Sequence, residues 1–142
     1  MRASGLQFDV VAFLMCDSVI RDAQTGKVNV QGVFDTIFVR ELPAIHSSTS
    51  AYFRLKFDAP KSGVVASLAF GSPSGIKHIT PDLPITNIGP TGMTEGWVNI
   101  QGLQFTEFGE HQFELLINGE SVARYFLIVQ QLETVPHGQQ LH

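Results

Sequence analysis

The stretch EHQFELLINGESVARYFLIVQQL, residues 110–132, decides the fold class of this chain. From His111 to Ile117, apolar residues alternate with polar ones with a single interruption, which is the pattern of a β-strand with one face in a core. The pair Asn118-Gly119 tolerates positive φ at both central positions of a type I′ turn. The run that follows is apolar on both faces, as in a strand covered on two sides. The stretch therefore predicts a β-hairpin in an all-β protein.

Strand patterns recur through the rest of the chain, and each is bounded by turn residues. They cover residues 8–16, 28–39, 51–57, 64–70 and 97–105. Gly26 supplies the positive φ of the turn between the first two, and Asp22 can bond the backbone two residues further on. Within 28–39 and 97–105 the apolar phase changes at Gly32 and at Gly102. A glycine at a change of phase predicts a β-bulge at each of these positions.

The whole pattern predicts an antiparallel β-sandwich with little or no helix. No window of the chain places apolar residues three and four apart between good helix caps. Seven or eight strands at this spacing predict an immunoglobulin-like or jelly-roll-like sandwich, with a partly closed barrel as the alternative. Residues 1–142 form a single domain, in which 71–92 is a surface loop rich in Gly and Pro and 134–142 is a C-terminal tail.

Composition excludes several classes of protein. The net charge is −4 and the nine Lys and Arg residues are scattered singly, which argues against a nucleic-acid partner. No apolar run approaches the roughly 20 residues that span a bilayer, so no membrane role is expected. Cys16 is the single cysteine and cannot form an intrachain disulfide. Because secreted small domains rely on disulfides, this favours a soluble protein of the cytoplasm.

The motif search predicts no catalytic residue, no cofactor and no metal site. The five histidines include no pair spaced by one or four residues, which excludes a His-x-His site and a helical zinc pair. A metal site gathered from distant loops stays open, with His46, His78 and His111 as its first ligands. His111 shares the apolar parity of the strand that it begins, so we expect it to be partly buried and bonded to a backbone group.

One group of side chains is a candidate interaction surface. Tyr52, Arg54 and Lys56 lie on the polar face of one predicted strand, and Trp97 begins another. Aromatic residues and arginine dominate the energetics of protein interfaces, so the four could form a binding surface. The alternative is that Trp97 covers the core.

Several turns and strand residues resemble a bacterial family. These are Asp17 to Ile20, Asp22-x-x-Thr25-Gly26-Lys27, Gly32-x-Phe34-Asp35-x-Ile37, Leu42-Pro43-Ala44, and a final hairpin with Phe113-x-Leu115, Ile117-Asn118-Gly119-Glu120 and Val122-Ala123. The pattern is similar to that of a family of small bacterial proteins known as a domain of unknown function. The resemblance implies a cytoplasmic β-sandwich and supplies no catalytic residue.

Three functions remain as expectations. The first is a non-enzymatic interaction or structural module that self-associates as a homo-oligomer or docks on a protein partner, as low charge and many Phe residues indicate. The second is a sandwich that binds a small ligand or carbohydrate, with Trp97 and Tyr52 as stacking platforms under the 71–92 loop. The third is a metal-dependent enzyme of jelly-roll type.

Overall fold

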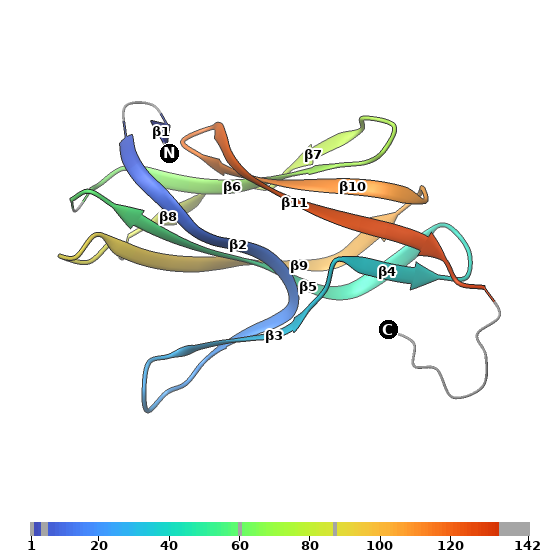
Figure 1. Ribbon diagram of the computed structural model, residues 1–142, viewed down its shortest axis with the longest axis horizontal. Coiled ribbons are helices and arrows are strands. Elements are labelled where there is room, and N and C mark those ends of the chain that lie inside the picture. The colour runs from blue at the N-terminus through green and yellow to red at the C-terminus, as the bar shows by residue number, and fades with distance from the viewer. Residues whose placement is uncertain (1, 4–5, 60, 87, 134–142) are drawn as a thin grey trace.

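The computed structural model of the chain describes residues 2–3, 6–59, 61–86 and 88–133. These residues form eleven β-strands and no helix, in two sheets that face each other around one core (Figure 1). The all-β sandwich expected from the sequence is confirmed. Nothing in these ranges has the length and apolarity of a helix that spans a membrane. The predicted tail, 134–142, lies outside the described residues.

The first sheet is wholly antiparallel. Its order is β1-β2-β5-β9, and β3 pairs with the far end of β2. Its strands are β1 (Arg2–Ala3), β2 (Leu6–Arg21), β3 (Val28–Val33), β5 (Ala44–Phe57) and β9 (Met93–Phe105). The strand β9 ends the sheet, since it pairs with β5 alone.

The second sheet has the order β4-β11-β10-β6-β7, with β8 also paired to β6. Its strands are β4 (Thr36–Val39), β6 (Val64–Gly71), β7 (Lys77–Ile79), β8 (Leu83–Ile85), β10 (Gly109–Ile117) and β11 (Glu120–Gln131). The pair β4–β11 is parallel, whereas the prediction was antiparallel throughout. The chain enters β4 from β3 in the other sheet and not through a hairpin with β11, so the pair is not held to the antiparallel direction.

The core lies between the sheets and is rich in aromatic side chains. Phe53 and Phe57 enter it from the first sheet and Phe113 from the second, and each is at most 1% exposed. Burial of one such side chain contributes roughly 1.5–3 kcal/mol. The alternation read in residues 51–57 and 111–117 is therefore the alternation between core and outer face.

The predicted C-terminal hairpin is confirmed. Asn118 and Gly119 have φ of 50° and 84°, and Ile117 pairs with Glu120 across the two-residue turn. A bulge follows, because the register shifts beside Leu115 and leaves Val122 without an opposite residue. Leu116, the apolar residue that interrupts the polar positions of this strand, lies at the shift.

The predicted bulges at Gly32 and Gly102 are wrong in form. Both glycines have positive φ, 70° and 65°, but the register of β2–β3 and of β5–β9 is constant across them. Each glycine therefore still has one residue opposite it on the neighbouring strand, and neither strand carries the extra residue that defines a bulge. In β9 the phase still changes, since Ile100 packs against the core from one phase and Leu103 from the other. The other register shift lies in β2, at Val11.

The strand count is also corrected, from seven or eight to eleven among the described residues. The stretch 28–39 is two strands, β3 in the first sheet and β4 in the second. The loop at 71–92 contributes two short strands, β7 and β8, that extend the second sheet beyond β6. These pairings are short because turns and prolines interrupt the segment.

The hairpin of residues 17–33, which we call the arm, leaves the body of the sandwich (Figure 1). Beyond Cys16, β2 no longer pairs with β5 and pairs with β3 alone. The arm reverses at Gly26, with φ of 73°, after Asp22 accepts hydrogen bonds from the backbone N–H of Gln24 at 2.8 Å and Thr25 at 3.2 Å. The predicted turn at Gly26 is therefore confirmed.

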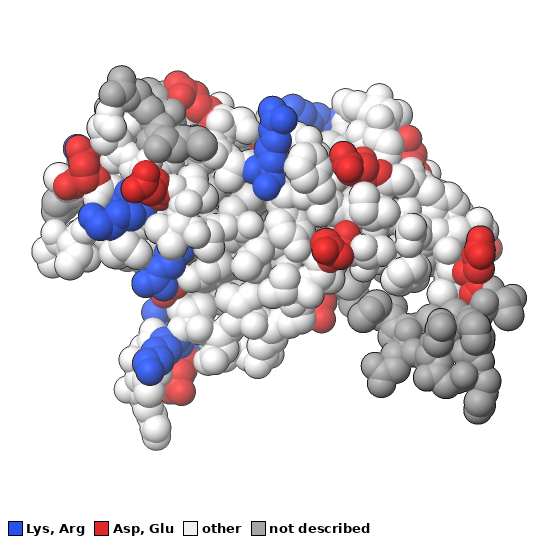
Figure 2. Space-filling model, viewed as in Figure 1, with Lys and Arg blue, Asp and Glu red and all other residues white. Residues whose placement is uncertain are grey.

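The surface carries few charges. Figure 2 shows Lys, Arg, Asp and Glu side chains scattered over one face of the molecule, with neutral surface between them. This matches the charged fraction of 15%. No extended patch of one sign is visible on that face.

Candidate functional site

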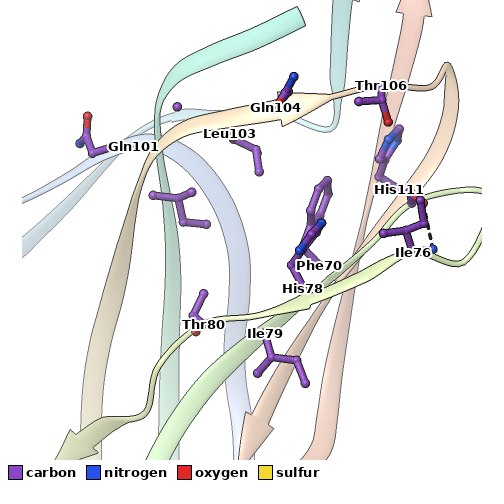
Figure 3. A pocket seen from close by; sticks show the side chains of 13 residues that line it. Phe70, Ile76, His78, Ile79, Thr80, Gln101, Leu103, Gln104, Thr106 and His111 are labelled. Carbon is purple, nitrogen blue, oxygen red and sulfur yellow. Dashed lines mark hydrogen bonds between the residues drawn. The ribbon is translucent and has the colours of Figure 1, made fainter. Parts of the chain in front are cut away.

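A cavity of about 410 Å³ lies between the edges of the two sheets. One wall is β9, the other is β7 with the turn before it, and the base is formed by β6 and the start of β10 (Figure 3). The walls are mainly apolar. They are formed by Phe70, Ile76, Ile79, Ile100 and Leu103, and polar side chains join them: Ser72, His78, Thr80, Gln101, Gln104 and Thr106.

His111 lines this cavity from β10 and is 1% exposed. Its ring stacks on Phe70, with centroids 5.6 Å apart and 11° between the planes, and meets Phe105 edge-on at 5.2 Å. Its Nδ1 atom lies 3.1 Å from the carbonyl oxygen of Gly109. The expected bond to a backbone group is therefore confirmed, and the side chain is buried more completely than the partial burial expected from the sequence.

The second ring nitrogen of His111 lacks a partner. Nε2 is one of two buried side-chain polar atoms without a hydrogen bond in the described part of the chain, and the other is Oγ1 of Thr49. A carbonyl only accepts, so Nδ1 carries the proton and Nε2 presents a lone pair. Burial lowers the pKa of His111 below 6.5, which keeps the ring neutral. An unsatisfied buried acceptor costs about 1–3 kcal/mol.

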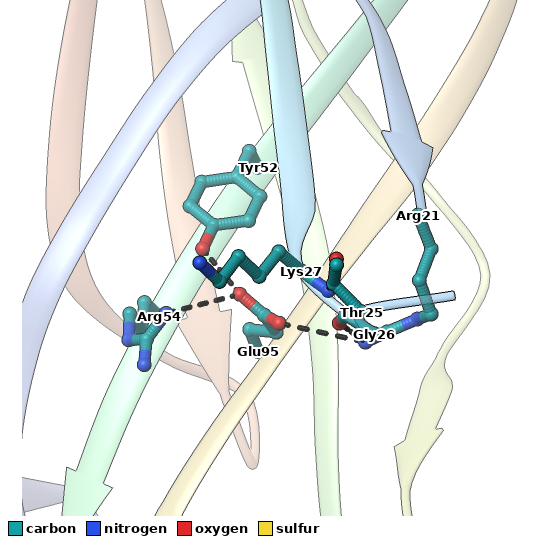
Figure 4. A network of polar contacts seen from close by, with 7 residues as sticks. All are labelled: Arg21, Thr25, Gly26, Lys27, Tyr52, Arg54 and Glu95. Carbon is teal, nitrogen blue, oxygen red and sulfur yellow. Dashed lines mark hydrogen bonds and ion pairs between the residues drawn. The ribbon is translucent and has the colours of Figure 1, made fainter. Parts of the chain in front are cut away.

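The predicted interaction surface is mostly brought together, around an acid that the prediction omitted. Glu95 on β9 accepts a hydrogen bond from the hydroxyl of Tyr52 at 2.5 Å and pairs with Arg54 at 3.3 Å (Figure 4). Arg21 reaches the same carboxylate from the arm, at 3.8 Å. Its guanidinium also lies 5.6 Å from the centre of the Trp97 ring.

This network fastens the arm to the outer face of the first sheet. Arg21 also donates to the carbonyl of Gly26 at 2.9 Å, so the end of the arm is tied internally and to β9. Burial, followed by the bond to Glu95, raises the pKa of Tyr52 above 10. Tyr52 is 7% exposed and so presents little surface to a ligand.

Lys56 lies apart from this network. Its Nζ donates to the carbonyl of Phe57 at 3.0 Å, next to the turn that contains Gly92. The structure thus joins Tyr52, Arg54 and Trp97 and places Lys56 elsewhere on the same strand.

Two other candidates have structural surroundings. Cys16 is buried, its pKa is raised to about 11 by burial and then by Asp17, and its thiol lies 3.5 Å from the carbonyls of Ser18 and Ser50. A thiol with this pKa is protonated at neutral pH and a poor nucleophile. His46 lies 3.5 Å from the carboxylate of Asp17 and packs on Phe34.

The proposed histidine ligands do not meet at one point. His78 and His111 line the same cavity from the second sheet, whereas His46 lies against Asp17 on the first sheet. Across the described ranges, no group of three or more His, Cys, Asp or Glu side chains could hold a metal ion.

Sequence reasoning missed Glu95 and the cavity. The strand containing Glu95 was expected to begin at Trp97, but β9 begins at Met93. The sequence did place Glu95 two residues before Trp97, on the same side of an extended chain. Only the pairing register, however, shows that Glu95 lies opposite Arg54. The cavity depends on the placement of β7 opposite β9, which no local pattern indicates.

The fold and the site define a small β-sandwich protein with an apolar cavity between its sheet edges and a β-hairpin arm bonded to the outer face of one sheet. The chain belongs to the family of unknown function DUF6941, whose model matches residues 11–130. No curated protein matches it.

The solved structures similar to this chain include two from Pseudomonas. One is the alkylpurine DNA glycosylase AlkC of Pseudomonas fluorescens bound to DNA with an abasic site analogue: TM-score 0.53, 12% identity, 89% of this chain covered and 31% of that one. The chain thus spans about a third of that protein, and the likeness concerns the fold alone. The other is an immunoglobulin-like protein of Pseudomonas aeruginosa: TM-score 0.42, 10% identity, 90% and 100% covered.

Proposed function

We propose that this protein is a non-enzymatic interaction module that pairs through the free edge of β9 with a second copy of the chain. The observation that carries the proposal is the length of that edge. β9 has 13 residues, whereas the other strands with a single partner, β1, β3, β4, β7 and β8, have two, six, four, three and three. A long sheet edge presents a row of main-chain groups to which another strand can bond.

The sequence of β9 lacks the features that protect natural edges. Such edges carry Lys, Pro or a bulge, or they are short. Met93–Phe105 contains no Lys, Arg or Pro, and it keeps one register with β5 along its length. Its one charge, Glu95, is engaged by Tyr52 and Arg54. The strand is therefore suited to edge-to-edge pairing about a two-fold axis.

Charge supports a protein partner over a nucleic acid. The net charge is −4, and the charges in Figure 2 are scattered rather than gathered into a basic surface. The likeness to a DNA glycosylase rests on 12% identity and brings no DNA-binding residue to this chain. The single buried cysteine supports a place in the reducing cytoplasm.

The test is the oligomeric state of the purified chain by light scattering behind a sizing column. We expect a dimer for the wild type and a monomer for the double variant Asn99→Lys, Gln101→Lys, because like charges on paired edges repel. The matched control is Ser121→Lys, Gln130→Lys, which adds the same charge to exposed positions of β11, a strand of the other sheet that does not border β9. A monomeric wild type at all concentrations, or a dimeric edge variant, would contradict the proposal.

A further inference from the structure

We infer that the cavity between β7 and β9 is a binding site for a small neutral molecule, mostly apolar, that donates one N–H or O–H hydrogen bond to Nε2 of His111. This inference does not depend on pairing of the β9 edge. It follows from the shape of the cavity, the protonation of the histidine and the chemistry of the walls.

The cavity suits a ligand of one or two rings. Its volume of about 410 Å³ lies at the lower end of the range of small-molecule sites, roughly 300–1,000 Å³. Ile76 and Ile79 form one side, and Ile100 and Leu103 form the other, so a flat apolar molecule would contact both sheets. Such walls contribute affinity by burying apolar surface.

The hydrogen-bonding character of the site is set by His111. Because Gly109 takes the Nδ1 proton, the atom left over is an acceptor that needs a donor. In Figure 3 the ring extends from β10 toward Thr106, above Ile76 and beside Phe70, among side chains that line the cavity. Phe70 and Phe105 hold the ring plane, so the acceptor direction is fixed before a ligand arrives.

Other classes of ligand fit less well. An anion would meet a neutral lone pair, and the carboxylate of Glu107 lies close enough to act on the charge of His111. A metal ion would need further ligands, and the described residues bring together no cluster of His, Cys, Asp and Glu around it. A neutral donor satisfies Nε2 without burying a charge.

The experiment compares indole with N-methylindole, which has the same ring but no N–H. By calorimetry we expect the wild type to bind indole about tenfold more tightly, the value of one good hydrogen bond. In His111→Phe, which keeps an aromatic ring between Phe70 and Phe105, the two probes should bind equally. Addition of indole to the wild type should also shift the ¹⁵N signal of Nε2, and N-methylindole should not.

A pair of exposed isoleucines provides the control for location. Ile79 lines the cavity and is 65% exposed, whereas Ile45 is 68% exposed and is not part of the lining. Ile79→Trp should weaken both probes and Ile45→Trp neither.

Three results would overturn the inference. They are saturable binding of neither probe, equal binding of both by the wild type, and a preference for indole that persists in His111→Phe. If that variant does not fold, the ¹⁵N shift in the wild type decides, since an unmoved Nε2 signal on saturation with indole would equally overturn it.

Discussion

The outer face of β9 and the cavity beside it both place an ionisable side chain against aromatic rings, but they differ in how that side chain is satisfied. Glu95 is bonded to Tyr52 and paired with Arg54 and Arg21. His111 has one backbone partner, and its Nε2 has none. The difference separates a polar group whose partners stabilise the fold from one that keeps its binding capacity for another molecule.

The energetic consequences of removing each side chain should therefore differ in size. Removal of Glu95 leaves three side chains without their shared partner: Tyr52, Arg54 and Arg21. Of these, Tyr52 is the most buried residue, at 7% exposed. Removal of His111 leaves only the carbonyl of Gly109 without its hydrogen-bond donor, and it also removes the unsatisfied acceptor Nε2. Loss of a satisfied partner costs the desolvation of those left behind, whereas loss of an unsatisfied atom does not.

The largest expected effect is that of Glu95→Ala. We expect it to lower the free energy of unfolding by about 2 kcal/mol, because the Tyr52 hydroxyl loses its acceptor in a partly buried setting and two exposed arginines lose an ion pair. Urea denaturation followed by circular dichroism measures this. Asp58→Ala is the control, since its ion pair with Lys61 is exposed and should contribute less than about 0.5 kcal/mol. An equal effect of Glu95→Ala and Asp58→Ala would mean that the Glu95 network stabilises the fold no more than an exposed ion pair does.

His111→Phe is expected to have a smaller effect, although His111 is the more deeply buried side chain. The free energy of unfolding should change by less than about 1 kcal/mol, because the ring packing is kept and an unpaired acceptor is removed. The same denaturation experiment measures it. A loss of unfolding free energy as large as that of Glu95→Ala would mean that Nε2 has a hydrogen-bond partner within the folded protein. Glu95 and His111 would then not differ in how they are satisfied.

The smallest effect is a dependence of stability on pH. Since burial lowers the pKa of His111 in the folded protein below 6.5, the unfolded chain takes up its proton first as the pH falls. The contribution of the neutral ring is fully present above pH 6.5 and is lost as the pH falls through the folded pKa. Glu107 opposes part of the shift, and His78 lines the same cavity.

The measurement for this effect is the difference in unfolding free energy between wild type and His111→Phe across acidic pH. The wild type should lose stability relative to the variant as the pH falls, because the phenylalanine cannot titrate. Parallel curves would show that His111 titrates alike in the folded and unfolded chain.

Local patterns predicted the parts of the fold that depend on neighbours in sequence. The Asn118-Gly119 hairpin and the Gly26 turn were predicted because two or three residues determine their backbone conformation. The core faces of β5 and β10 followed from alternation alone. The burial of His111 followed from its parity with Phe113.

Features that join distant segments could not be predicted in this way. The crossing from β3 to β4 looked like one strand, since both halves are apolar and a bulge explains a change of phase as well as a change of sheet does. The contact of Arg21 with Glu95 needs the arm to turn across the sheet. The free nitrogen of His111 depends on which carbonyl its other nitrogen finds, and composition and spacing do not report that.

The order of the strands along the chain also limits when the second sheet can be completed. Of the described strands, its central pair β10 and β11 leave the ribosome last, whereas β4 and β6, which flank them, emerge much earlier. One edge of β6 and the whole of β4 must therefore wait in a nascent chain for a partner strand that is made later, and the β4–β11 pairing joins Thr36 to Ile128. Such long-range closure slows folding and exposes strand edges during synthesis.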